Sequence, residues 1–181
     1  MKTATRSSVT ISVTDELVLT DGTVLRVRSV GAGDREALAA FFSRLSPESR
    51  RRRFLGPKPR LTTHELTYLT QIDHRMHEAL AAVDDTDGSI AGVSRYAGWD
   101  GHDGVAEIAI AVADDVQGHG IGGALAARIV HRARANGIGR LTATTQWDNW
   151  SARALLRRLG FRVRESGELL ELELTLSSSA R

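Results

Sequence analysis

The chain has 181 residues, of which 41% are hydrophobic and 25% charged, and it contains no cysteine. This length accommodates one domain with a substantial core and is short for two. The absence of cysteine excludes disulfide bonds, a thiol nucleophile and a cysteine-ligated metal. A formal net charge of +2 is too small to indicate nucleic-acid binding, and no apolar run is long enough for a membrane helix.

The N-terminal segment 1–16 is polar, rich in Ser and Thr, and has no apolar signal core. We therefore expect a flexible tail over 1–16, a single domain over 17–181 and a cytoplasmic location. At the start of this domain, Asp21-Gly22 separates two apolar runs. That pattern predicts a β-hairpin, because glycine accepts the positive φ of a tight turn.

Three helices are predicted next. Asp34 precedes apolar residues at helical spacing, and we expect it to cap that helix. Ser46-Pro47 indicates a second start, with the proline in the first turn. Thr62 and Glu65 fit a capping box for the third helix.

The remaining elements alternate between strands and helices. Strands are predicted over 78–83, 89–96, 105–112, 141–145, 161–163 and 169–176. A long helix closed by Asn136-Gly137 follows the third of these strands, and a second helix over 152–159 ends at Gly160. This order predicts a mixed α/β sheet with helices on its faces.

Residues 112–123 carry the strongest functional pattern, because a strand ends, four glycines fall within six residues and a helix begins. Glycines let the backbone approach a ligand, and their N–H groups add to the positive end of the following helix. The segment therefore predicts an anion site suited to a diphosphate. A nucleoside triphosphatase loop would need Lys followed by Ser or Thr, and a dinucleotide site would need a later acidic residue; neither is present.

Gln117, Gly120 and Gly122 match every fixed position of motif A of the GNAT superfamily of acetyltransferases, which the chain therefore resembles. Residues 149–161 resemble the Asn-x-x-Ala…Gly-Phe helix of the same superfamily. The resemblance implies a GNAT-like acyltransferase fold of the α/β class, with a central, mostly antiparallel sheet and helices on both faces. It also implies acetyl-coenzyme A as cosubstrate and no metal.

The resemblance further implies which residues hold the cosubstrate. Backbone groups would pair with the pantetheine arm, and the glycine loop would bind the pyrophosphate. These residues are Ile110, Ala111, Val112, Gln117, Gly118, His119, Gly120, Ile121, Gly122, Gly123 and Asn149. Asn149 has a second interpretation, as a plain helix N-cap. Leu156 departs from the superfamily, where a tyrosine general acid is common, because leucine has no proton to donate.

Transfer to an amine needs a base, because a lysine amine with a pKa of about 10.4 is protonated at neutral pH. Alternation along 105–112 places Glu107 on one face among small apolar residues, a few residues before the glycine loop. We therefore identify Glu107 as the candidate catalytic base. The alternative is an ordinary solvated strand position.

Three histidines are the other candidate bases. We expect His64, His74 and His77 to be surface residues. His74 and His77 are also potential metal ligands, but no third ligand stands at a suitable spacing, so no metal site is expected.

Further segments resemble the catalytic domain of bacterial Pat-type protein lysine acetyltransferases over about residues 17–165. They are 45–50, Arg53-Phe54, 69–73 and 106–110, and the last is where that family places its catalytic glutamate. The resemblance implies a lysine of a partner protein as acceptor, notably on an AMP-forming acyl-coenzyme A synthetase, and neither nucleic acid nor membrane as partner.

Two other functions stay open: acetylation of a small amine, and coenzyme A binding by a non-catalytic regulator. The basic run Arg50–Arg53 has two interpretations as well. It either recognises an acidic surface of a partner protein or forms a solvated helix face.

Overall fold

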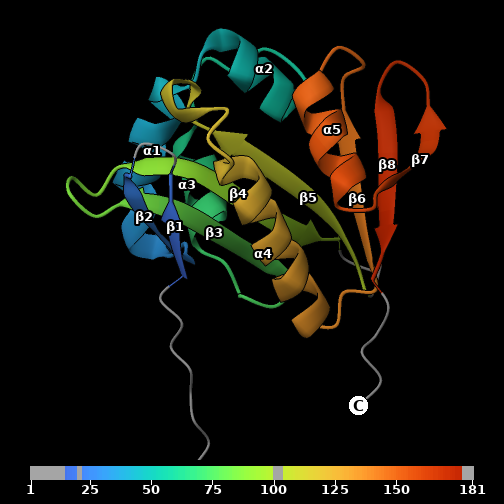
Figure 1. The fold of residues 1–181 in the computed structure, drawn as a ribbon, viewed down its shortest axis with the longest axis horizontal. Helices are drawn as coiled ribbons and strands as arrows, with labels where there is room; N and C mark the ends of the chain where they lie inside the picture. The colour runs from blue at the N-terminus through green and yellow to red at the C-terminus, as the bar shows by residue number, and fades with distance from the viewer. Residues whose placement is uncertain (1–14, 20–21, 100–103, 177–181) are drawn as a thin grey trace, which may run out of the picture.

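A computed structural model describes residues 15–19, 22–99 and 104–176, and within them an eight-stranded sheet carries helices on both faces (Figure 1). The strands are β1 (Asp15–Val18), β2 (Val24–Ser29), β3 (His77–Asp84), β4 (Ile90–Gly98), β5 (Val105–Val112), β6 (Arg140–Thr145), β7 (Arg162–Ser166) and β8 (Leu170–Thr175). The helices are α1 (Arg35–Arg44), α2 (Pro47–Phe54), α3 (Thr63–Thr70), α4 (Ile121–Ala135) and α5 (Trp150–Arg158). No helix in these residues is long and apolar enough to span a membrane.

The strands lie in the order β1-β2-β3-β4-β5-β6-β8-β7. Every neighbouring pair is antiparallel except β5 and β6, which run parallel. The prediction of a mostly antiparallel mixed α/β sheet is therefore confirmed. The predicted hairpin near the N-terminus is the β1–β2 pair, although residues 20 and 21 of its turn lie outside the described residues.

The sheet divides at its one parallel junction. β5 pairs with β6 only from Val105 to Glu107, whose partners are Arg140 to Thr142. Beyond these residues β5 stays paired with β4 as far as Val112, and β6 stays paired with β8 as far as Thr145. The two strands therefore separate in the middle of the sheet, which leaves one edge of β5 without a neighbouring strand.

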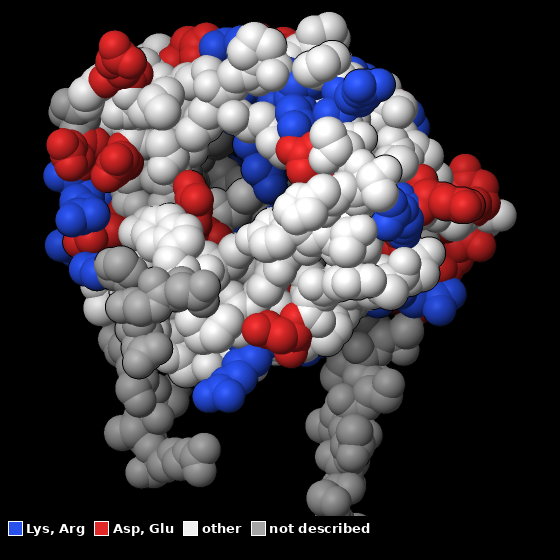
Figure 2. Space-filling model, turned by 180° about the vertical axis from the view of Figure 1, so that it is seen from behind, with Lys and Arg blue, Asp and Glu red and all other residues white. Residues whose placement is uncertain are grey.

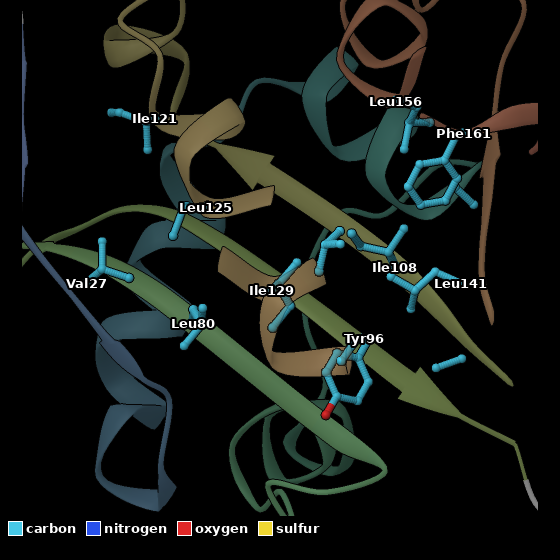
Figure 3. Close-up of a cluster of buried hydrophobic side chains, with 14 of the residues drawn as sticks. Val27, Leu80, Tyr96, Ile108, Ile121, Leu125, Ile129, Leu141, Leu156 and Phe161 are labelled. Atoms are coloured by element: carbon cyan, nitrogen blue, oxygen red, sulfur yellow. The ribbon is translucent and has the colours of Figure 1, made fainter. Parts of the chain in front are cut away.

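A hydrophobic core fills each face of the sheet. On one face, α4 lies across the central strands, and Leu125 and Ile129 pack with Leu80, Ile108 and other apolar side chains (Figure 3). The helix lies close to the sheet, because a Cβ added at Gly92 of β4 would come within 3.0 Å of Leu125. On the opposite face, α1 and α3 cover a second core.

Two predicted helix starts are confirmed. The Ser46 hydroxyl accepts a hydrogen bond from the Ser49 N–H at 3.1 Å and so caps α2. At α3, the Thr62 hydroxyl accepts from the Glu65 N–H at 3.2 Å, while the Glu65 carboxylate accepts from the Thr62 N–H at 2.8 Å. Short polar side chains therefore start these two helices as their sequences predict.

Two expectations about the N-terminal part are wrong in detail. Asp34 occupies the N-cap position of α1 without a side-chain cap, because its carboxylate binds the Arg28 guanidinium at 2.6 and 2.8 Å and the Gly31 N–H at 2.8 Å. The predicted tail over 1–16 also ends too late, since β1 already begins at Asp15. Residues 1–14 lie outside the described residues.

Candidate active site

A cleft of about 800 Å³ opens where β5 and β6 separate. Its walls come from α2, α3, β4, β5, β6, α5 and the start of α4. It brings together the predicted site residues Glu107, Ile110, Ala111, Val112, Gln117, Gly118, Gly120, Ile121, Gly122, Gly123 and Asn149. His119 does not join them; it is exposed and is not part of the cleft lining.

The glycine loop leaves the first turn of α4 open to a ligand. Gly118 and Gly120 have φ values of 84° and 86°, a conformation that costs other residues roughly 1–2 kcal/mol. Gly120 is the N-cap of α4 and provides no side-chain cap, and a Cβ added at Gly118 or Gly120 would meet no atom within 4 Å. The loop therefore presents backbone N–H groups and the positive helix end at the cleft, which suits a pyrophosphate.

The loop is held in place by α2. The Asp114 carboxylate accepts hydrogen bonds from the N–H and hydroxyl of Ser46, at 2.9 and 2.7 Å, and from the Ser49 hydroxyl at 2.7 Å. Gln117 donates to the Val112 carbonyl at 3.1 Å and so closes its own loop. The sequence carries no local signal for the contact between Asp114 and α2, because 65 or more residues separate the partners.

The start of α5 forms the facing wall. The Asn149 side chain accepts a hydrogen bond from the Ala152 N–H at 3.2 Å, so the N-cap interpretation holds while Asn149 also lines the cleft. Leu156 is buried in the core and borders the same cleft. Tyr68 of α3 also lines the cleft.

Glu107 stands at the point where the strands divide, but its surroundings differ from the expectation. The β4–β5 register pairs Ala97 with Glu107 and Arg95 with Ala109, which places Arg95 on the same face as Glu107. Arg53, in the last turn of α2, also lines the cleft and interacts electrostatically with Glu107. Glu107 is therefore not isolated among apolar residues, because two arginines from other elements accompany it.

Arg95 lies at the centre of this group and is only 5% exposed. Its guanidinium donates to the Leu69 carbonyl at 3.2 Å and lies 3.2 Å from Nε2 of His77. Burial, together with the charge of Arg53, lowers the pKa of Arg95 to about 9. Burial, together with the charge of Arg95, lowers the pKa of His77 to about 4.

His77 is therefore neutral at pH 7 and is not the surface histidine expected from the sequence. Its ring stacks on Tyr68 with 4.8 Å between centroids. His64 is exposed, and His74 is exposed with Nδ1 3.0 Å from the Glu78 carboxylate. The described part of the chain holds no group of three or more His, Asp or Glu side chains that could bind a metal.

The arginines of the basic run on α2 have different partners within the chain. Arg50 donates to the Pro59 and Ser43 carbonyls, at 3.0 and 2.8 Å. Arg51 and Arg52 both bind the Glu48 carboxylate, and Arg51 reaches Asp148 as well, at 3.2 Å. Basic side chains reach into the hollow on the side of the molecule opposite α4 (Figure 2).

The acetyltransferase (GNAT) family model matches residues 41–161. An acetyltransferase of Pseudomonas aeruginosa is 34% identical over 145 residues, which are 79% of this chain and 77% of that protein. The acetyltransferase Pat of Mycolicibacterium smegmatis is 31% identical over 135 residues, and the match covers 74% of this chain but 40% of Pat.

Solved structures agree with these matches. The GNAT domain of Pat from S. lividans superposes with a TM-score of 0.82 and 29% identity, over 90% of this chain and 96% of that domain. A protein of Salmonella typhimurium, solved with acetyl-coenzyme A as its cofactor, shares the fold with a TM-score of 0.68 and 20% identity, over 87% of this chain and 96% of the other. The chain belongs to the GNAT family and is an acetyl-coenzyme A-dependent acetyltransferase.

Proposed function

We propose that the chain transfers the acetyl group to a lysine side chain of a protein, with Glu107 as the catalytic base. The position of Glu107 carries this proposal, because it lines the cleft at the last β5–β6 pair, and the glycine loop, Arg53 and Tyr68 line the same cleft. The similarity to Pat over 74% of the chain supports a protein as acceptor.

In this proposal the cosubstrate lies along the free edge of β5 with its pyrophosphate at the glycine loop. Residues 110–112 have no neighbouring strand on the β6 side, so their backbone can pair with the amides of the pantetheine arm. The N–H groups from Gly118 to Gly123 receive the pyrophosphate, and Asn149 borders the arm from α5. Acetyl-coenzyme A, when bound there, supplies the thioester whose acetyl carbon the amine attacks.

The catalytic role of Glu107 follows from the charge of the acceptor. The carboxylate removes a proton from the lysine ammonium, directly or through one water, and leaves the lone pair of the neutral amine free to attack. The new C–N bond forms while the C–S bond breaks, the sulfur leaves with the electron pair, and the second proton of the nitrogen passes through solvent to the thiolate. Leu156 provides no acid for that sulfur, and a thiolate needs little help to leave.

The rim of the cleft supports a macromolecular acceptor over a small amine. Tyr68 and Trp99 line the cleft with 52% and 49% of their surface exposed, and Leu55 is exposed beside them. Large apolar side chains exposed around a cleft are typical of surfaces that contact another protein. A small-molecule amine remains the second candidate, and a direct comparison of acceptors separates the two.

The deciding experiment uses mass spectrometry of a bacterial AMP-forming acetyl-coenzyme A synthetase after incubation with this protein and acetyl-coenzyme A. We expect acetylation of one active-site lysine, and no acetylation with the Glu107→Gln variant. Small amines, including polyamines and amino acids, are assayed in parallel by thiol release. Turnover of small amines without any protein acetylation would contradict the protein acceptor and would leave the cosubstrate site intact.

A further inference from the structure

Arg53 differs from the other arginines of α2 in its partners. Arg50 is held by backbone carbonyls, whereas Arg51 and Arg52 are held by Glu48. Arg53 forms neither a hydrogen bond nor an ion pair with any described residue. Its guanidinium carbon lies 4.9 Å from the centroid of the Phe54 ring.

Arg95 adds a second charge without a carboxylate partner. Its hydrogen bonds lead to the Leu69 carbonyl and to the neutral ring of His77. Arg53 and Arg95 both border the cleft and, beside it, a smaller cavity of about 30 Å³. Both arginines therefore border open space while their surroundings are largely protein.

The charges around this space do not balance. Arg53 interacts electrostatically with the Glu107 carboxylate and with the Arg95 guanidinium, whereas Arg95 has no carboxylate partner among the described residues; burial lowers the pKa of both arginines. Holding like charges in a partly dehydrated site costs free energy, which an anionic ligand would recover through charge-assisted hydrogen bonds. Arginine is the side chain best suited to bind a carboxylate, because its planar fork of donors matches the two oxygens.

We propose that Arg53 and Arg95 form an anion subsite that receives a carboxylate of the acceptor protein close to the target lysine. This inference rests on the proposed function, because it assumes that the acceptor amine meets Glu107.

The sheet register suggests where that carboxylate stands in the acceptor. Arg95 and Glu107 are diagonal neighbours across β4 and β5, a relation that separates side-chain origins by about 7–8 Å. In an extended acceptor segment, residues two apart lie on one face about 7 Å from each other. An acidic residue two positions before or after the target lysine therefore matches the spacing between the subsite and the base.

The test uses peptides with one lysine and either Glu or Gln two residues before or after it. Wild-type protein should acetylate the better Glu peptide with a KM at least tenfold below that of its Gln counterpart. Arg53→Gln should bring the ratio of the two KM values, Gln peptide over Glu peptide, close to one. Arg26→Gln is the control, because it removes the same charge from the distant ion pair with Asp85, and it should leave this ratio unchanged. The subsite would be overturned if Arg53→Gln raised the KM of both peptides by the same factor. It would also be overturned if the wild-type protein had the same KM for the Glu and Gln peptides.

Calorimetric binding of the same peptides in their acetyl-lysine form separates this inference from the proposed function, because it needs no turnover. The subsite is supported if the wild-type protein binds the Glu peptide more tightly than the Gln peptide and Arg53→Gln loses this difference. This holds even if no peptide is acetylated, and in that case only the protein-lysine proposal fails. If the Glu and Gln peptides are acetylated equally well and their acetyl-lysine forms bind equally tightly, the protein-lysine proposal stands and the subsite is overturned.

Discussion

Glu107 of β5 and Thr142 of β6 are the last two residues that pair where the strands run side by side. One residue further along, the strands no longer pair and the cleft begins. The candidate base therefore stands on rigid, paired backbone, while the next residues of the same strand have a free edge. This combination places a fixed carboxylate next to a segment that can bind an extended ligand.

We expect Glu107→Gln to lower the turnover number by roughly a hundred- to ten-thousand-fold, the range typical of a lost general base. Glutamine keeps the shape and polarity of the side chain but does not accept the proton of the ammonium group. Coenzyme A affinity, measured by calorimetry, should stay at the wild-type value. Glu36→Gln, on the exposed surface of α1, is the matched control. Near-normal turnover of Glu107→Gln would rule out Glu107 as the base.

The glycine loop can be tested with two glycines of the same conformation. Gly120 and Gly88 have φ values of 86° and 73°, and an added Cβ meets no atom within 4 Å at either site. Alanine at each should destabilise the fold by a similar amount, about 1–2 kcal/mol, as seen in urea unfolding. Only Gly120→Ala should weaken coenzyme A binding, by about tenfold or more. Equal affinities of the two variants would argue against the loop as the pyrophosphate site.

Asp114 should stabilise the fold in a pH-dependent way. Burial raises its pKa, but the hydrogen bonds from Ser46 and Ser49 outweigh this effect and hold the pKa below its ordinary value of 3.8. The ionised form therefore stabilises the fold above that value, and the stabilisation is lost as the pH falls through the lowered pKa. Asp114→Asn should cost about 1 kcal/mol at pH 7 and progressively less below pH 4.

Urea unfolding at several pH values measures this difference. Asp115→Asn is the neighbouring control, because Asp115 forms one exposed ion pair with Arg44 and should contribute less than about 0.5 kcal/mol. Since Asp114 connects α2 to the loop, Asp114→Asn should also raise the KM for acetyl-coenzyme A. A cost that stays constant down to pH 3 would contradict the role of the charged carboxylate.

His77 should make the fold less stable in mild acid. Its pKa is lowered from 6.5 to about 4, so between these values the unfolded chain takes up a proton that the folded protein excludes. Stability should therefore fall as the pH drops from 6.5 to 4, by on the order of 1–3 kcal/mol. His77→Gln, which keeps an acceptor for Arg95, should flatten this dependence in urea unfolding, whereas His64→Gln on the exposed surface should not. An equally steep dependence in His77→Gln would refute the assignment.

Much of the fold follows from local patterns. The strand over 105–112 has the predicted bounds, and the caps at Ser46 and Thr62 start their helices as expected. These features depend on residues a few positions apart, so the chain itself contains the information. Asp34 shows the limit, because a competing partner, Arg28, attracts its carboxylate away from the helix it precedes.

The amino-acid sequence by itself determined the glycine loop, the strand that carries Glu107 and the family resemblance, because each is a pattern over a short run of residues. Only the tertiary structure decided what surrounds Glu107. Arg53 and Arg95 come from a helix and a strand 42 positions apart, and their approach to Glu107 depends on how α2 docks and on the register of β4 and β5. Burial and the charge of a neighbour distant in sequence then lower the pKa of His77, and periodicity along the chain contains neither of these effects.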